Sequence, residues 1–474
     1  MAGVKIDKFG GIAPRQHPTQ LADGMAVTAH NCRLKIGKLV PLRQPKAVAG
    51  SNIMLDGGLV NIADARSIHV WRKADGTFDF VLFKGMTWTS PGNVADDTLT
   101  RMIVSGDRDG DGTVDEPVLY IRTSPTVRDA VPLIKKPMPA PHVVRNSGQT
   151  DLSTTENIRY TYFFVTWIDK YGMESPVSAP SQVLIEGQWK DGDLEYLDGD
   201  NVTITNFGTA EDYPDAVKVR VYKIVTGTES ETIQFITEEK ITPSLWDIGI
   251  GVKVKDENAG ETMPEIEAPP SDLQSILDVP GSYYCGFAPS LPKTVCFSDV
   301  NLLYSWPLAY RYDVRDNIVA LAVTSNSVFV LTDGWPYVLN GTLPESMTVT
   351  KLAGPAACVS PRGVAVYKNA VYYVSNAGLM CIYNDADEGT VCTNVTDKVF
   401  TKDQWLALNP ETCVMGQHDG ALFLFFEADG GSHSGLVVDL TESSGTAVTT
   451  HDEAAKCLCV DDREDKMYYV REMK

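Results

Sequence analysis

The sequence predicts an all-β protein, a β-propeller into which a β-sandwich is inserted. Four strand-like runs near the C-terminus look like copies of one unit: 326–332, 369–375, 420–426 and 465–471. Their first residues lie 43, 51 and 45 positions apart. A period near 45 suits a four-stranded blade, which cannot bury both of its faces alone and stacks on its neighbours. Amphipathic helical patterns are almost absent, and the clearest is a short run at 403–407 that Pro410 ends.

The N-terminal part contains three further runs of the same character, at 67–73, 78–84 and 117–123. They share the length and the aromatic–aliphatic alternation of the C-terminal units. A proline-rich stretch at 135–142 follows them and reads as an extended spacer. We therefore expect the first blades in residues 1–138 and the blades that close the ring in residues 271–474.

The sequence pattern changes in residues 139–270, and the new pattern predicts a separate sandwich domain. A long aromatic strand is expected at 159–169, followed by a turn that leads into a second strand by 185. Further strands are expected at 201–207, 217–225, 235–241 and 252–257, which is the density of a small sandwich. The run YTYFFVTWIDKYGMESPVS resembles the strand–turn–strand of fibronectin type III-like domains. This resemblance covers the insert alone, and such sandwiches carry many functions.

Charge and composition exclude several classes of protein. The 474 residues include 41 basic and 62 acidic side chains, a net charge of −21, which argues against a surface that grips phosphate backbones. Two interpretations stay open: an ordinary acidic protein, or a surface along which nucleic acid slides without being held. No apolar stretch approaches 18 residues, so we expect no membrane span, and the start has no signal-peptide pattern, so we expect assembly where the chain is made. The nine cysteines lack zinc-site spacing and are expected to be reduced.

One acidic loop has the spacing of a calcium site. Asp107, Asp109, Asp111 and Asp115 match positions 1, 3, 5 and 9 of an EF-hand-type loop, in which a hard cation takes several carboxylate oxygens from one tight turn. Position 12, which is normally a bidentate glutamate, is Val118. The loop is therefore either a structural Ca²⁺ site or an acidic hairpin turn, and no cofactor is otherwise required.

The sequence gives no sign of an enzyme. The seven histidines are scattered, and neither a nucleophile elbow nor a phosphate-binding loop nor a dinucleotide fingerprint is present. Five aromatic residues lie close together in sequence and suit either a sugar-binding or nucleic-acid-stacking surface or packing between blades: Trp306, Tyr310, Tyr312, Trp335 and Tyr337. We expect no catalytic residues, and we expect these aromatics to pack between blades.

Several long segments resemble a structural protein of tailed bacteriophages. They are 9–42 (FGGIAPRQHPTQ…), 290–341 (SLPKTVCFSDVNLLYSW…), 341–352, 357–382 and 399–410 (VFTKDQWLALNP). The pattern is similar to the tail nozzle or hub proteins of short-tailed phages, also described as packaged-DNA stabilisation proteins. The match is a pattern of turns and strands outside the sandwich, and no single residue in it is a chemical signature.

This resemblance implies a virion protein that forms a homohexameric ring in the tail. The ring would extend the portal–adaptor channel, retain packaged DNA and conduct it during ejection. Its partners would be portal and adaptor proteins above, tail fibre or needle proteins nearby, and genomic DNA that passes without sequence-specific binding. Assembly would take place in the host cytoplasm. The competing interpretation is a receptor- or glycan-binding propeller of a tail or surface protein.

Overall fold

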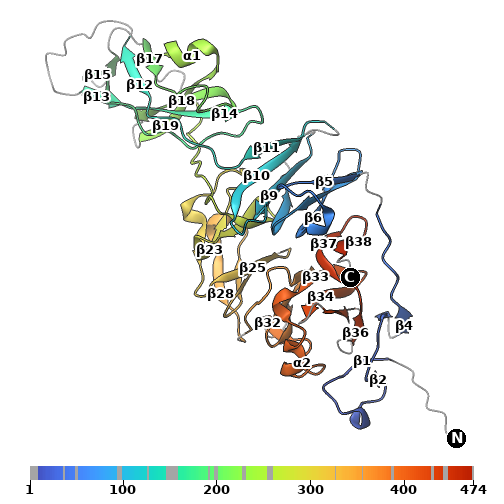
Figure 1. The fold of residues 1–474 in the computed structure, drawn as a ribbon. Helices are drawn as coiled ribbons and strands as arrows, with labels where there is room; N and C mark the ends of the chain where they lie inside the picture. Colours follow the sequence, from blue (N-terminus) through green and yellow to red (C-terminus); the bar gives the residue numbers. More distant parts are fainter. Residues whose placement is uncertain are drawn as a thin grey trace. The chain divides into compact units, whose positions relative to one another are not determined.

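The computed structural model describes most of the chain, in two compact units (Figure 1). Unit 1 comprises Met1–Leu133, Pro270–Leu303 and Leu308–Lys474, and unit 2 comprises Ile134–Pro269 and Tyr304–Pro307. The boundaries expected from sequence were 138/139 and 270/271. The described residues are 9–35, 38–48, 52–92, 99–124, 128–145, 158–190, 193–196, 201–226, 231–253, 260–325, 327–354, 356–385, 389–428, 432–440 and 447–471.

Five antiparallel sheets of unit 1 have four strands each, paired in chain order. Within each sheet the strands alternate apolar residues with smaller or polar ones, as a pleated strand between two packed faces requires. The strands are β8 (Thr87–Pro91), β9 (Arg101–Gly106), β10 (Asp115–Arg122) and β11 (Arg128–Pro132); β21 (Gln274–Val279), β22 (Tyr283–Ala288), β23 (Leu291–Phe297) and β24 (Arg311–Asp313); β25 (Ile318–Val323), β26 (Val328–Thr332), β27 (Tyr337–Asn340) and β28 (Thr348–Lys351); β29 (Val364–Tyr367), β30 (Ala370–Ser375), β31 (Gly378–Asp385) and β32 (Gly389–Asn394); β33 (Val414–His418), β34 (Ala421–Ala428), β35 (Ser432–Asp439) and β36 (Ala447–His451).

Two smaller sheets come from the two ends of the chain and close the ring. One has the order β5-β7-β6, with β5 (Ile53–Leu55) parallel to β7 (Phe78–Phe83), and β6 (Ser67–Arg72) antiparallel to β7. The other is the hairpin of β37 (Ala455–Asp461) and β38 (Lys466–Arg471). A hydrophobic cluster that includes Leu82, Cys457 and Val470 joins these two sheets.

The remaining junctions follow the chain around the ring. Apolar clusters join each of the four-stranded sheets from β21 onward to the next, and one more joins β33–β36 to β37–β38. Phe83 and Met102 share a cluster between the β5–β7 sheet and the β8–β11 sheet. Ser90 Oγ donates to Ile276 O at 2.7 Å, which links β8 to β21. Unit 1 is therefore a closed β-propeller of seven described sheets, as the sequence predicts.

The repeated runs occupy one position in successive blades. The four C-terminal runs correspond to β26, β30, β34 and β38, and each is the second strand of its sheet. The first run begins at Asn326, which lies outside the described residues. The three N-terminal runs correspond to β6, β7 and β10. The strand predictions for the propeller are thus confirmed.

The N-terminal segment packs against the last four-stranded sheet. It forms β1 (Gly11–Ile12), β2 (Met25–Ala26), β3 (Cys32–Lys35) and β4 (Lys38–Pro41). Thr450 N donates to Ala29 O at 2.9 Å, and Thr449 Oγ1 donates to Cys32 O at 2.6 Å. Sequence patterning does not reveal this contact, because it joins residues more than 400 positions apart.

Helices are short and few in the described residues. The α-helices are α1 (Pro243–Ile248) and α2 (Lys402–Leu406), and the 3₁₀ turns are η1 (Pro18–Gln20), η3 (Ile62–Asp64), η5 (Leu308–Tyr310), η6 (Pro344–Ser346) and η7 (Pro410–Thr412). The predicted helix at 403–407 is confirmed as α2, which begins with a capping box between Thr401 and Gln404. No helix in the described part of the chain is both long and apolar enough to cross a membrane.

Unit 2 is a β-sandwich of three small sheets around one core. Phe163, Val165, Val219 and Val221 are fully buried in that core. The sheets have the orders β12-β17-β20, β13-β15-β16 and β14-β18-β19. The strands are β12 (His142–Arg145), β13 (Ile158–Thr161), β14 (Phe163–Asp169), β15 (Leu184–Lys190), β16 (Asp193–Tyr196), β17 (Asn201–Thr205), β18 (Ala216–Thr226), β19 (Glu231–Lys240) and β20 (Ile250–Lys253).

Two features of unit 2 differ from the prediction. The strand expected at 159–169 breaks at Tyr162, and its halves β13 and β14 join different sheets. The strand expected by 185 begins at Leu184 as β15, but the segment 170–183 before it forms no strand, although three serines bind it to β14. Ser175, Ser178 and Ser181 each donate a backbone N–H to β14 and accept one through Oγ. The bonding serines recur every three residues, whereas their partners in β14 recur every two. A period of three fits an extended polyproline-like backbone rather than a β-strand.

The cysteines are reduced, as expected. All nine are free thiols, and seven of them are buried. Burial raises the pKa of Cys358 to about 12, so this thiol stays protonated. These cysteines contribute to packing between strands.

Candidate metal centre in an acidic hairpin loop

The acidic loop connects β9 to β10 and is held in place by glycines. Gly110 and Gly112 have positive φ values of 76° and 91°, which turn the chain sharply between the strands. The loop also lies close against two glycines elsewhere: a Cβ on Gly57 would be 1.9 Å from Arg108 O, and a Cβ on Gly85 would be 2.5 Å from Asp107 Oδ1. These two positions accept only glycine without displacing the loop, and no sequence pattern connects them with it.

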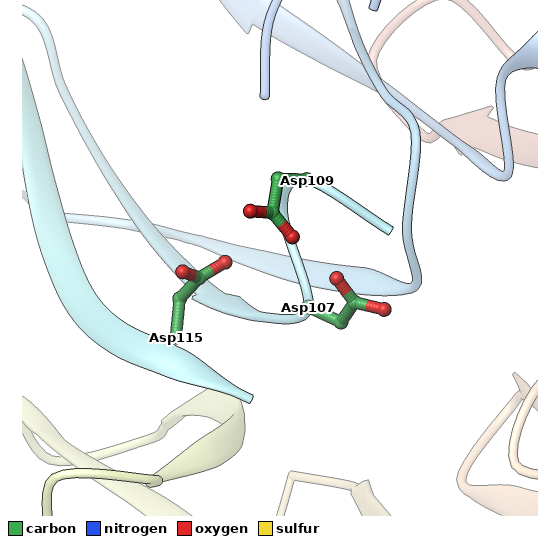
Figure 2. A group of neighbouring side chains, drawn as sticks. All are labelled: Asp107, Asp109 and Asp115. Carbon is green, nitrogen blue, oxygen red and sulfur yellow. The ribbon is translucent and has the colours of Figure 1, made fainter. Parts of the chain in front are cut away.

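Three of the four predicted aspartates converge. Asp107, Asp109 and Asp115 each offer a carboxylate oxygen, and these atoms lie within 4.8 Å of one another (Figure 2). Asp107 also organises the turn, since its Oδ1 accepts from Gly110 N at 2.6 Å and its Oδ2 from Gly112 N at 3.1 Å. Three converging carboxylates can contribute ligands to a hard cation, although Ca²⁺ usually takes six to eight oxygens.

The structure does not bring Asp111 into this group. Its Oδ1 accepts hydrogen bonds from Thr113 Oγ1 at 2.6 Å and from Thr113 N at 2.8 Å. The bond from the Thr113 hydroxyl is the main reason that the pKa of Asp111 is lowered. Asp111 therefore serves the turn itself, in the manner of ordinary Asx turns.

One cation lies beside the three carboxylates. Arg108 Nε is 3.5 Å from Asp115 Oδ2, and Arg108 N donates to the same oxygen at 2.7 Å. Arg108 offsets part of the negative charge that would otherwise accumulate. Elsewhere in the described residues, no other group of three His, Cys, Asp or Glu side chains has metal-ligand spacing.

Four of the five clustered aromatic residues pack at one junction between blades. Tyr337 is buried between the β21–β24 and β25–β28 sheets, and Tyr310, Tyr312 and Trp335 pack against the same cluster. Trp306 is 1% exposed and belongs to unit 2. The prediction of packing between blades is therefore confirmed for Tyr310, Tyr312, Trp335 and Tyr337.

Comparisons with known proteins identify no family. No family model matches the chain, and no curated protein matches it. Among solved structures, it is similar to apo AztD from Citrobacter koseri, at 13% identity over 65% of this chain and 76% of that one, with a TM-score of 0.29. It is also similar to Hsv2 from Kluyveromyces lactis (12% identity, 48% and 57% of the chains, TM-score 0.25) and to a functionally unknown protein from Desulfotomaculum acetoxidans (9%, 64% and 83%, TM-score 0.26). Likeness at this level assigns no activity.

Proposed function

We propose that this chain is a structural subunit of a bacteriophage tail nozzle or hub, which forms a six-membered ring around the DNA channel. The observation that carries the proposal is the similarity of segments 9–42, 290–352, 357–382 and 399–410 to that family. These segments belong to unit 1, except for Tyr304–Pro307, which belongs to unit 2. A closed propeller is a rigid scaffold, because its closure leaves few free sheet edges.

The charge of the chain supports a conduit. A net charge of −21 repels DNA phosphates, and repulsion allows a duplex to slide through a channel without being held. In this role the ring belongs to the virion tail and is assembled in the host cytoplasm. Portal and adaptor proteins lie above it, and fibre or needle proteins lie nearby.

An open sheet edge supports assembly from identical copies. In the described residues no strand pairs with the outer edge of β38, and such an edge is a template for strand addition by another chain. The turn before β38 (461–465, DDRED) is acidic, whereas the exposed segment 43–48 carries Arg43 and Lys46. In Figure 1 this segment runs without secondary structure between β4 and β5. We propose that segment 43–48 of one copy lies along β38 of the next copy, a head-to-tail contact of the kind that closes rings.

Cross-linking of isotope-labelled copies tests this contact. Lys46 is exposed, and the Lys466 side chain is 58% exposed, so an amine-reactive linker reaches both. In rings assembled from equal amounts of ¹⁴N and ¹⁵N chains, we expect Lys46–Lys466 cross-links with mixed labels. If Lys46–Lys466 cross-links are absent, or if each of them carries a single label, the contact between copies is not the one proposed. A chain that stays monomeric beside its partners and binds a ligand alone would favour the receptor- or glycan-binding propeller.

We also propose that the acidic loop holds a structural Ca²⁺ ion. Asp107, Asp109 and Asp115 would supply carboxylate oxygens, and backbone carbonyls and water would supply the rest. Binding would tie β9 to β10 at their connection and stiffen one blade. No catalytic role is proposed for the ion.

Calcium titration of paired variants tests this site. Millimolar Ca²⁺ should raise the thermal unfolding temperature of the wild-type chain, because an ion that binds only the folded state stabilises it. Asp107→Asn combined with Asp109→Asn should abolish this shift, and Asp111→Asn should keep it, since Asp111 bonds to Thr113 instead. An equal shift in all three proteins would show that Ca²⁺ binds elsewhere. If Ca²⁺ does not raise the unfolding temperature of the wild type, the loop is an acidic hairpin turn without an ion.

A further inference from the structure

A small cavity with basic walls lies at one mouth of the propeller. Its volume is about 80 Å³, and its walls include Arg66, Arg362, Thr412, Phe425, Glu427 and Lys456. Arg66 immediately precedes β6, Arg362 precedes β29 by one residue, Thr412 precedes β33, and Lys456 lies at the start of β37. The strands β29, β33, β37 and β6 contact one another in that order around the ring. The cavity is thus built where the first residues of four inner strands meet.

Arg362 reaches across this mouth. Its Nη1 donates to Lys456 O at 2.8 Å and lies 3.5 Å from Arg66 O, so one guanidinium spans three blades. A guanidinium has five N–H donors, so these two carbonyls leave donors for another acceptor. In the described part of the chain, no carboxylate oxygen lies within ion-pair distance of Arg66 or Arg362. Burial, with the charge of Arg66 adding to its effect, lowers the pKa of Arg362.

The local charge is opposite to that of the whole protein. Three of the lining residues are cationic, and Glu427 is the one acid among them, whereas the chain carries a net charge of −21. Concentrating like charges around a partly desolvated cavity is costly unless an anion compensates them. This cost is the reason to look for an anionic ligand here.

We infer that this cavity binds a small oxyanion, and that a single phosphate group is the class that fits. A water molecule needs roughly 10–15 Å³ of such space, so the cavity has room for about five to eight water-sized groups, enough for the five non-hydrogen atoms of a phosphate group. Arginine presents two parallel N–H donors that match two phosphate oxygens. The site is independent of the proposed ring, because all of its lining residues belong to one propeller.

Binding of inorganic phosphate by matched variants tests the inference. Titration calorimetry at constant ionic strength should show that the wild type binds phosphate and that Arg66→Gln and Arg362→Gln each weaken it by at least about tenfold. Glu427→Gln should strengthen binding, because it removes the one negative charge from the lining. Lys402→Gln removes an exposed cation from α2 and should leave the affinity unchanged. Arg66 is itself exposed, so its variant should fold normally even if Arg362→Gln does not.

Two further probes distinguish the source of the phosphate. Inorganic phosphate that competes with an oligonucleotide bearing a 5′-phosphate, but not with the same oligonucleotide without it, assigns the site to a nucleic-acid end. Binding of inorganic phosphate alone assigns it to the free ion. The inference is overturned if phosphate fails to bind at 20 mM, roughly the upper end of useful weak affinities. It is also overturned if Arg66→Gln and Lys402→Gln bind phosphate equally well.

Discussion

Replacing Trp405 with alanine is expected to lower the free energy of unfolding of the propeller by about 3–5 kcal/mol, the usual cost of removing a buried aromatic side chain. Trp405 is 1% exposed, although it lies on the five-residue helix α2 at the surface of the ring. Its ring packs against Phe400 and Phe426, at 5.9 Å in each case, and its Nε1 donates to Ser375 O at 2.7 Å. The substitution would remove this packing together with the hydrogen bond from the indole to the Ser375 carbonyl.

The neighbouring residue supplies the control. Leu406 is on the same helix but 39% exposed, so Leu406→Ala should cost about 1 kcal/mol or less. Trp405→Phe keeps a ring in the cluster and loses the hydrogen bond, and it should fall between the two. Denaturant unfolding followed by circular dichroism measures all three. Equal losses for Trp405→Ala and Leu406→Ala would mean that α2 does not depend on its buried face.

Breaking the ion pair between Lys135 and Asp169 is expected to have the largest effect in unit 2. The Lys135 and Asp169 side chains are 4% and 1% exposed, and Lys135 Nζ lies 2.8 Å from Asp169 Oδ2. Asp169 Oδ1 also accepts from Tyr171 N at 2.8 Å and from Met173 N at 2.9 Å, which fixes the turn after β14. Lys135→Met would leave a buried carboxylate without its cation, at a cost of about 3–5 kcal/mol.

A double variant distinguishes the effect of an unpaired buried charge from the loss of the Lys135 side chain itself. Lys135→Met with Asp169→Asn removes both charges, so it should be more stable than Lys135→Met alone. Lys136 is the matched control, because it is 67% exposed and 3.7 Å from a half-exposed Asp212. Lys136→Met should change the stability by about 1 kcal/mol at most. A double variant no more stable than Lys135→Met would show that packing against Trp167, rather than charge, is what Lys135 contributes.

Regular repeats made much of the propeller predictable. The second strand of four successive blades was visible because it alternates aromatic or β-branched residues with smaller ones and follows a polar turn. The last strands of two blades, β24 and β28, are shorter or more polar, and their patterns are correspondingly weak. The break at Tyr162 could not be predicted, because the aromatic alternation continues across it. The pairing nevertheless changes there, since β13 pairs with β15 and β14 pairs with β18. The serine repeat 175–178–181 was a readable signal of the extended segment that follows.

The sites were less predictable than the fold. Spacing singled out Asp107, Asp109 and Asp115, but it could not show that Asp111 bonds to Thr113 instead of joining them. The basic cavity had no signature in the sequence. Arg66, Arg362 and Lys456 are separated by 296 and 94 positions, and only the closure of the ring brings them together.

Electron microscopy of the purified chain, alone and with portal and adaptor proteins, tests the central claim most directly. The proposed function predicts six-fold rings of the 51.8 kDa chain around a hole of about 20 Å or more, wide enough for duplex DNA. Such rings would direct attention to the residues that line the hole. Separate propeller-and-sandwich particles that never join a ring, even beside those partners, would contradict it.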